Sequence, residues 1–192
     1  MTASDLIATY ALAVAIVALG FTIGSFWWLN ARPGKLEIIG EPRSFGFGAA
    51  TELMLTLPLV FSNSRPLPAV AINIRLQLEA SGFPQVVPFV ATVDGILPSP
   101  GSPRHMATSI VIQGRETRLI CGQFISGPFE VKLSGPTEVP ATVESYVLRG
   151  WWKWHRQSWR ALLTFPLRLP ELTAEQRNHY IAVDNQSPIG PG

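Results

Sequence analysis

Cysteine is the scarcest informative residue in this chain. The sequence holds a single one, Cys121, which excludes an internal disulfide framework and every Cys-x-x-Cys motif. Cys121 lies in the apolar run Thr117–Ile125, where a thiol is expected to be a small buried hydrophobe rather than a nucleophile. One lone thiol also agrees with a reducing compartment.

Motifs of the common catalytic classes are missing as well. The sequence has no Gly-x-Ser-x-Gly and no P-loop, and Gly46-Phe-Gly48 lacks the third glycine of a dinucleotide fingerprint. The three histidines, His105, His155 and His179, are far apart, and the thirteen acids are dispersed. We therefore expect no enzymatic activity, no metal site and no cofactor. The net charge of +2 argues against a nucleic-acid partner.

Charge is absent from the stretch Leu6–Leu29. A bilayer core needs about 20 consecutive apolar residues, so this stretch predicts a transmembrane helix, with Ser4 as its cap and Asp5 at its positive end. A signal peptide is a poor alternative, because the first five residues carry no cation and no small-x-small cleavage site follows. A buried helix of a soluble protein is the other reading.

The flanks of this helix suggest its orientation. Arg32, Lys35 and Arg43 follow it, whereas no Lys or Arg precedes it. Because the cytoplasmic flank is the one richer in Lys and Arg, we expect a single-pass protein of the bacterial inner (cytoplasmic) membrane, with the N-terminus outside and the following domain in the cytoplasm. An envelope protein of reversed orientation is the alternative.

The helix carries two faces of small residues. At about 100° per residue, one face is a narrow stripe, and the second contains a Gly-x-x-x-Gly match. Small residues let helices approach closely in lipid, so these faces predict packing on other integral membrane subunits. The predicted helix-packing residues are Ala8, Ala11, Ala15, Ala18, Thr22 and Ser25 on the stripe, and Gly20 and Gly24 on the second face.

After the helix, apolar and polar residues alternate with a period of two. The pattern is clearest in Leu53–Phe61 and in Val70–Glu79, where Val70, Ile72, Ile74, Leu76 and Leu78 are expected on one face. Seventeen prolines and sixteen glycines separate short runs of this kind. The runs predict a mainly β fold, an antiparallel β-sandwich of Greek-key type. The expected strands are 35–40, 51–61, 70–78, 85–93, 107–113, 117–125, 129–133, 141–154 and 159–169, with a loop over 41–50.

The C-terminal segment reads differently. Leu172–Ala182 predicts a short helix, capped by Thr173 with Gln176 three residues on, and a polar tail follows it. The expected organisation is a flank at 1–5, a transmembrane helix at 6–29, a linker at 30–34, a β-sandwich domain at 35–170, and a short helix with an extended tail at 171–192.

Tryptophan and cations gather in a second notable stretch, Arg149–Arg168, which contains no acid. Three readings compete: contact with the membrane surface, contact with a protein partner, and tryptophans that pack into the core while the cations face water. Trp27 and Trp28, at the end of the helix, also suit the interface. The predicted contact residues are Trp27, Trp28, Arg149, Trp151, Trp152, Lys153, Trp154, Arg156, Trp159 and Arg160.

One segment resembles a known kind of domain. Leu57–Glu79 has an apolar strand, Asn63 at a turn, prolines and then an alternating strand, and in this it is similar to bacterial membrane-tethered immunoglobulin-like β-sandwich domains. The resemblance implies a sandwich fold and assigns no functional residue.

Together these features predict a non-catalytic accessory or scaffold subunit of a larger membrane protein complex, of respiratory or photosynthetic type. Its helix would pack on neighbouring transmembrane helices, and its β domain would brace the complex at the membrane surface. The alternative is a free-standing tethered module that binds lipid headgroups, or a peptide at an exposed sheet edge.

Overall fold

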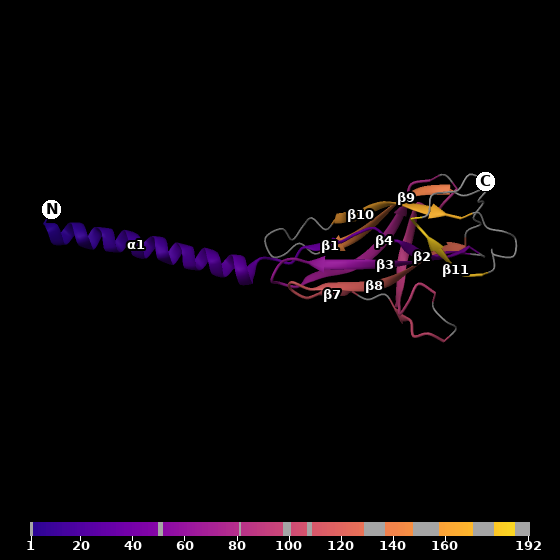
Figure 1. The fold of residues 1–192 in the computed structure, drawn as a ribbon, viewed down its shortest axis with the longest axis horizontal. Helices are drawn as coiled ribbons and strands as arrows, with labels where there is room; N and C mark the ends of the chain where they lie inside the picture. Colours follow the sequence, from indigo (N-terminus) through magenta and orange to yellow (C-terminus); the bar gives the residue numbers. More distant parts are fainter. Residues whose placement is uncertain are drawn as a thin grey trace.

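One N-terminal helix and a curled antiparallel sheet make up the structure (Figure 1). The computed structural model describes residues 2–49, 52–80, 82–97, 101–106, 109–128, 137–147, 158–170 and 179–186. The predicted mainly β fold with a single N-terminal apolar helix is confirmed.

Helix α1 (Ala3–Phe26) projects from the domain and buries none of its residues. Thr2 caps it, because the Thr2 hydroxyl accepts from the Asp5 N–H and the Asp5 carboxylate accepts from the Thr2 N–H at 2.8 Å. The prediction of Ser4 as the cap was therefore wrong by two residues. The helix continues into a π-helical turn, η1 (Trp27–Ala31), and ends before Pro33, which has no N–H to extend it. Ala3–Ala31 is long and apolar enough to cross a membrane.

Eleven strands are described. They are β1 (Leu36–Ile38), β2 (Ser44–Ala49), β3 (Glu52–Asn63), β4 (Ala69–Leu78), β5 (Val86–Val93), β6 (His105–Met106), β7 (Ile110–Ile112), β8 (Thr117–Pro128), β9 (Thr137–Val147), β10 (Ser158–Leu169) and β11 (Ile181–Asp184).

The strand order is β10-β9-β4-β5-β8-β3-β2-β11, and β1, β6 and β7 join the sheet on β3, β5 and β4. Strand β5 connects the two layers of the curled sheet. Val86–Pro88 pair with β4, whereas Phe89–Val93 pair with β8, and the pairing shifts register between Phe89 and Ala91. The sheet therefore folds over itself and encloses a single apolar core.

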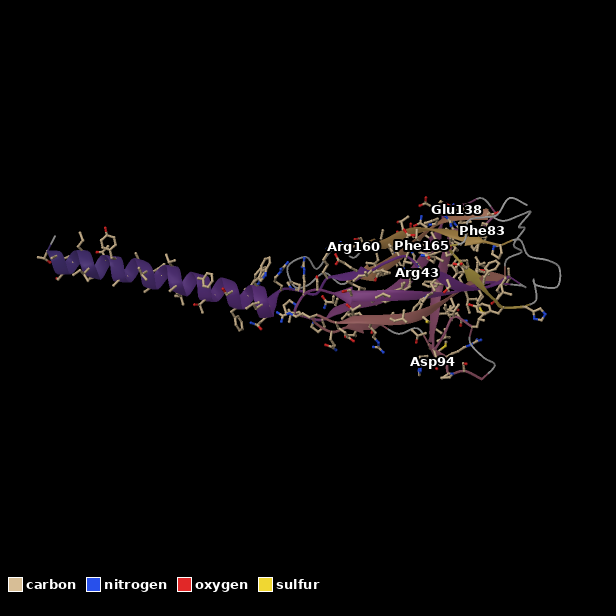
Figure 2. The ribbon with its side chains drawn as sticks, in the orientation of Figure 1. Arg43, Phe83, Asp94, Glu138, Arg160 and Phe165 are labelled. Carbon is tan, nitrogen blue, oxygen red and sulfur yellow. The ribbon has the colours of Figure 1, made fainter. Side chains whose placement is uncertain are left out.

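The core lies between these layers. Leu53, Leu55, Leu57, Leu59 and Phe61 alternate inward along β3 and are buried, as their period of two predicts. The facing layer contributes buried side chains from β4, β9 and β10, and the largest ring from this side is Phe165 (Figure 2). Each such side chain contributes about 1.5–3 kcal/mol when fully buried.

Strand β4 departs from the predicted alternation. Ala69 and Ala71 are buried, whereas Ile72 is 40% exposed. A register shift between Ala71 and Asn73 against β9 changes the inward parity, so the core face resumes at Ile74. The expectation that Val70 and Ile72 share a face with Ile74 was therefore wrong.

Two further predictions were wrong. The segment 41–50 contains β2 instead of a loop only, because Phe45 and Phe47 alternate into the core and glycines stand between them. Ile181 and Ala182, predicted as the end of a helix, lie in β11, which pairs with β2. Residues 171–178, with Thr173 and Gln176, lie outside the described residues, as does the expected strand 129–133.

Candidate functional site at the helix–domain junction

The helix meets one end of the domain, and Asn63 organises that end. Asn63 is buried, with 1% of its surface exposed. Its Oδ1 accepts from the N–H groups of Lys35 and Arg65, each at 3.1 Å, and its Nδ2 donates to the carbonyl oxygens of Leu67 at 2.8 Å and Gln113 at 3.0 Å. One side chain therefore joins the chain leaving the helix to the β3–β4 turn and the β7–β8 turn.

Two arginines from these turns reach the helix end itself. Arg115 Nη2 donates to the carbonyl oxygen of Leu29 at 2.8 Å, and Arg65 Nη1 donates to that of Pro33 at 3.3 Å. The last carbonyls of a helix have no partner within the helix and carry partial negative charge. The Arg115 guanidinium therefore satisfies one of these carbonyls, and the Arg65 guanidinium bonds the linker just after the helix, so that together they tie the helix end to the domain.

Two glycines allow the backbones at this junction to pack closely. A Cβ on Gly34 would lie 2.4 Å from the carbonyl oxygen of Pro68, and a Cβ on Gly114 would lie 1.7 Å from that of Pro66. Real Cβ atoms do not approach a backbone oxygen so closely, so both positions require glycine. The linker and the two turns are thus packed together as one unit, and residues 30–34 do not form a loose tether.

Positive charge gathers at this same end of the domain. The described cations there come from the linker, both turns and strands β8 and β10, and Figure 2 labels Arg160 on the side toward the helix. Arg32 stacks its guanidinium 3.7 Å from the centre of the Trp28 ring, a cation–π contact. The cations are Arg32, Lys35, Arg65, Arg115, Arg118 and Arg160.

The strand ends on either side of residues 148–157 lie at this end of the domain. Val147, the last residue of β9, pairs with Ala71 near the start of β4 and with Ser158, the first residue of β10. Strand β9 therefore ends, and strand β10 begins, beside the junction. The predicted contact residues Arg149, Trp151, Trp152, Lys153, Trp154 and Arg156 lie outside the described residues.

Trp159 packs against the outer face of the sheet. Its ring lies 5.5 Å from that of Tyr146 and 4.0 Å from the guanidinium carbon of Arg75, whose Nε donates to the Glu144 carboxylate at 2.6 Å. The half-buried Trp159 is therefore held by neighbouring strands, whereas Arg160 is exposed. Of the two, Arg160 is the better placed for an outside partner.

The predicted helix-packing residues lie on the open surface of α1. All are exposed except Ser25, which is half-buried, and nothing lies within 4 Å of a Cβ built on Gly20 or Gly24. An apolar hollow lies near the C-terminal end of α1, and Phe21, Gly24, Ser25, Trp28 and Leu29 line it. The small faces are thus available to another helix.

The described residues with the most reactive side chains are Cys121, His105 and His179. Burial and the nearby Asp94 carboxylate raise the pKa of the half-buried Cys121 thiol, which disfavours the nucleophilic thiolate. His105 and His179 are exposed. Within the ranges that the structure describes, no group of three His, Cys, Asp or Glu side chains could hold a metal ion.

The C-terminal segment fastens the two layers of the sheet. The buried Asn185 accepts from the Arg168 N–H at 2.9 Å and donates to the carbonyl oxygens of Pro166 at 3.0 Å and Pro42 at 3.1 Å. Its own N–H donates to the Arg43 carbonyl at 2.7 Å. One amide thus joins the edge of β10 to the segment between β1 and β2.

Tyr180 covers the outer face of β2. Its ring lies where side chains at Gly46 and Gly48 would be, since a Cβ on Gly48 would stand 2.8 Å from the ring. Its hydroxyl donates to Thr56, and burial raises the pKa of Tyr180 to about 12. Gly46 and Gly48 therefore leave room on β2 for this ring. The sequence pattern did not indicate this role.

This raised pKa predicts a loss of stability at high pH. The unfolded tyrosine ionises near pH 10, before the folded one does, so the free energy of unfolding should fall between pH 10 and about 12. Denaturant titrations across this range measure the slope. Tyr180→Phe should flatten it and should lower stability by about 1 kcal/mol at pH 7, because the bond to Thr56 is lost. An unchanged slope would contradict the burial of this phenol.

Asn63, Arg65, Arg115 and Asn185 were not predicted as site residues. Asn63 was recognised only as a turn residue, and its sequence neighbours do not reveal that its partners lie 28 and 50 positions away. No protein-family model matches the chain, and no curated protein sequence matches it.

Proposed function

We propose that this chain is a non-catalytic accessory subunit of a larger membrane protein complex, of respiratory or photosynthetic type. Helix α1 would cross the bacterial cytoplasmic membrane with its N-terminus outside and pack on neighbouring transmembrane helices. The β domain would brace the complex at the cytoplasmic surface.

The tightly built junction is the observation that carries this proposal. A free-standing binding module is served well by a flexible tether, which lets the module search for its ligand. Here Asn63, Arg65 and Arg115 bond the helix end to the domain, and Gly34 and Gly114 pack the linker against the turns. A fixed angle between helix and domain suits a brace.

The helix supplies the second line of support. Its small faces and the hollow at Gly24 match the close approach that drives helix association in lipid. The exposed Arg160 and the basic aromatic stretch would then contact lipid or a partner subunit beside the junction.

Native size tests the proposal directly. The tagged chain should be extracted from its own membrane in mild detergent, separated by native electrophoresis, and its co-migrating chains identified by mass spectrometry. We expect it to migrate well above its own 21.0 kDa plus a micelle, with the same integral membrane chains in replicate preparations. Migration as a lone chain would instead support the tethered binding module.

Filling the hollow should release the chain from its complex. A Cβ at Gly24 meets no atom of the chain itself within 4 Å and the position is exposed, so in Gly24→Leu the fold should remain intact while a helix partner is displaced. We expect the co-migrating fraction to fall on the order of tenfold. Leu6→Phe is the control and should co-migrate normally, because it adds bulk where no predicted helix-packing residue lies three or four positions away. Equal behaviour of the two variants would remove Gly24 from the interface.

A further inference from the structure

Three arginines surround the point where the helix leaves the domain. They come from separate segments: Arg32 from the linker, Arg65 from the β3–β4 turn and Arg115 from the β7–β8 turn. Arg115 and Arg65 each donate to a carbonyl of the helix end or linker, at 2.8 Å and 3.3 Å. The Arg115 guanidinium therefore reaches the last helical turn, the Arg65 guanidinium reaches the linker after it, and Arg32 contacts the exposed Trp28.

These guanidinium groups keep bonding capacity for a ligand. A guanidinium has five N–H donors, and the bonds to Leu29 and Pro33 use one donor of each arginine. The guanidinium carbon of Arg32 lies 3.7 Å from the centre of the Trp28 ring, and this cation–π contact does not use an N–H group as a donor to oxygen. All three can therefore still donate to phosphate oxygens, which guanidinium groups bind in a bidentate manner.

The acids at this end are already engaged. Glu37 pairs with Lys35, and the Glu116 carboxylate accepts from the Gln113 N–H at 2.7 Å. The six cations named above outnumber Glu37 and Glu116 at this end, so the field at the junction is positive, and Arg118 and Arg160 extend it along the domain.

Arg115 occupies a conformation that favours glycine. Its φ is 60°, and it is the one described non-glycine residue with a positive φ. The left-handed region costs such a residue about 1–2 kcal/mol. Glycine would fit this turn without that cost, so the side chain supplies a contact that outweighs the strain.

We propose that Arg32, Arg65 and Arg115 form a binding site for the phosphate groups of anionic lipids in the leaflet that faces the domain. This inference rests on the membrane-spanning helix of the proposed function. The anionic bilayer surface is favoured over a soluble polyanion because the arginines contact the helix end and the linker after it, where headgroups would surround the chain. Lipid held there fixes the depth of the helix, and through the junction it fixes the height of the domain.

Lipid selectivity of the full chain tests the site. The chain, purified in a neutral detergent, is titrated with phosphatidylglycerol or phosphatidylcholine, and retained lipid is counted by native mass spectrometry. We expect a preference for phosphatidylglycerol that Arg32→Gln with Arg115→Gln weakens about tenfold or more, since each arginine near an anionic surface contributes about fivefold. Arg43→Gln with Arg104→Gln removes the same charge from exposed positions away from the junction and should change little.

Two more arms complete the test. Arg32→Lys with Arg115→Lys keeps the charge without the planar fork and should give an intermediate affinity, provided circular dichroism shows the same fold. Excess inorganic phosphate should not displace the lipid; full displacement would overturn the lipid assignment in favour of a free-phosphate site. Equal retention of the two lipids by the unmodified chain, or equal losses in the two Gln pairs, would also overturn it. No partner protein is present in this measurement. Lipid selectivity can therefore be absent while the native size of the complex is normal, and lipid selectivity can be present while the chain migrates alone.

Discussion

Replacing Asn63 with leucine should lower the free energy of unfolding of the β domain by about 3 kcal/mol or more. Asn63 makes four bonds of 2.8–3.1 Å to backbone groups of three segments, and a leucine would leave those groups buried without partners. Urea titration of the full chain in detergent, followed by circular dichroism, measures the change.

Two further variants test whether the loss of stability comes from the hydrogen bonds of Asn63. Asn73→Leu changes the same residue type at an exposed position of β4 and should shift stability by less than about 0.5 kcal/mol. Asn63→Asp keeps the acceptor but turns the donor into a second acceptor that faces the carbonyls of Leu67 and Gln113, so it should be nearly as damaging as leucine. Stability of Asn63→Leu close to that of the unmodified chain would show that the junction does not depend on this amide.

Gly114→Ala should also lower the free energy of unfolding by roughly 3 kcal/mol or more, although it adds a single methyl group. The new Cβ would lie 1.7 Å from the Pro66 carbonyl oxygen and 2.5 Å from its carbon, so the β3–β4 and β7–β8 turns must separate. Their separation would also break the 3.0 Å bond from the Arg115 N–H to the Arg65 carbonyl. Amide hydrogen exchange should therefore rise at Arg115.

The matched control is Gly127→Ala in β8, where nothing lies within 4 Å of the added Cβ. This variant should keep its stability within about 0.5 kcal/mol. If Gly114→Ala were equally silent, the close packing of the two turns would be refuted.

The features that follow from local pattern could be predicted from the sequence. Leu6–Leu29 has enough uncharged apolar residues to span a bilayer, and it lies within the helix and turn Ala3–Ala31. Leu53–Phe61 alternates strictly, and its inward leucines are buried. In both cases the structure of the segment depends on its own composition and on the periodicity of its apolar residues, so the local pattern is sufficient to predict it.

The features that depend on distant partners could not be predicted. The bulge in β4 arises from its pairing with β9, and no residue within Ala69–Leu78 indicates it. β11 forms because the edge of β2 offers backbone partners, which overrides the helical signal at Ile181 and Ala182. The predicted strands likewise do not indicate that the amide of Asn185 joins β10 to the segment between β1 and β2.

The junction is the part of the candidate site that sequence reasoning missed most completely. Arg65 and Arg115 are separated by 50 positions, and only the folded sheet brings their turns to the helix end. Arg32 and the Trp27–Trp28 pair were recognisable because they adjoin the helix in sequence. The basic aromatic stretch was recognised from composition alone, and of its predicted contact residues the structure describes Trp159 and Arg160.

Rigidity between helix and domain is the central claim, and electron spin resonance measures it most directly. In a Cys121→Ala background, spin labels at Val17→Cys on α1 and Leu119→Cys on β8 lie on exposed positions. Double electron–electron resonance of the full chain in lipid nanodiscs should give a single narrow distance distribution, and Asn63→Leu should broaden it. A broad distribution in the chain without the Asn63 change, as a flexible linker gives, would contradict a fixed junction and with it the brace.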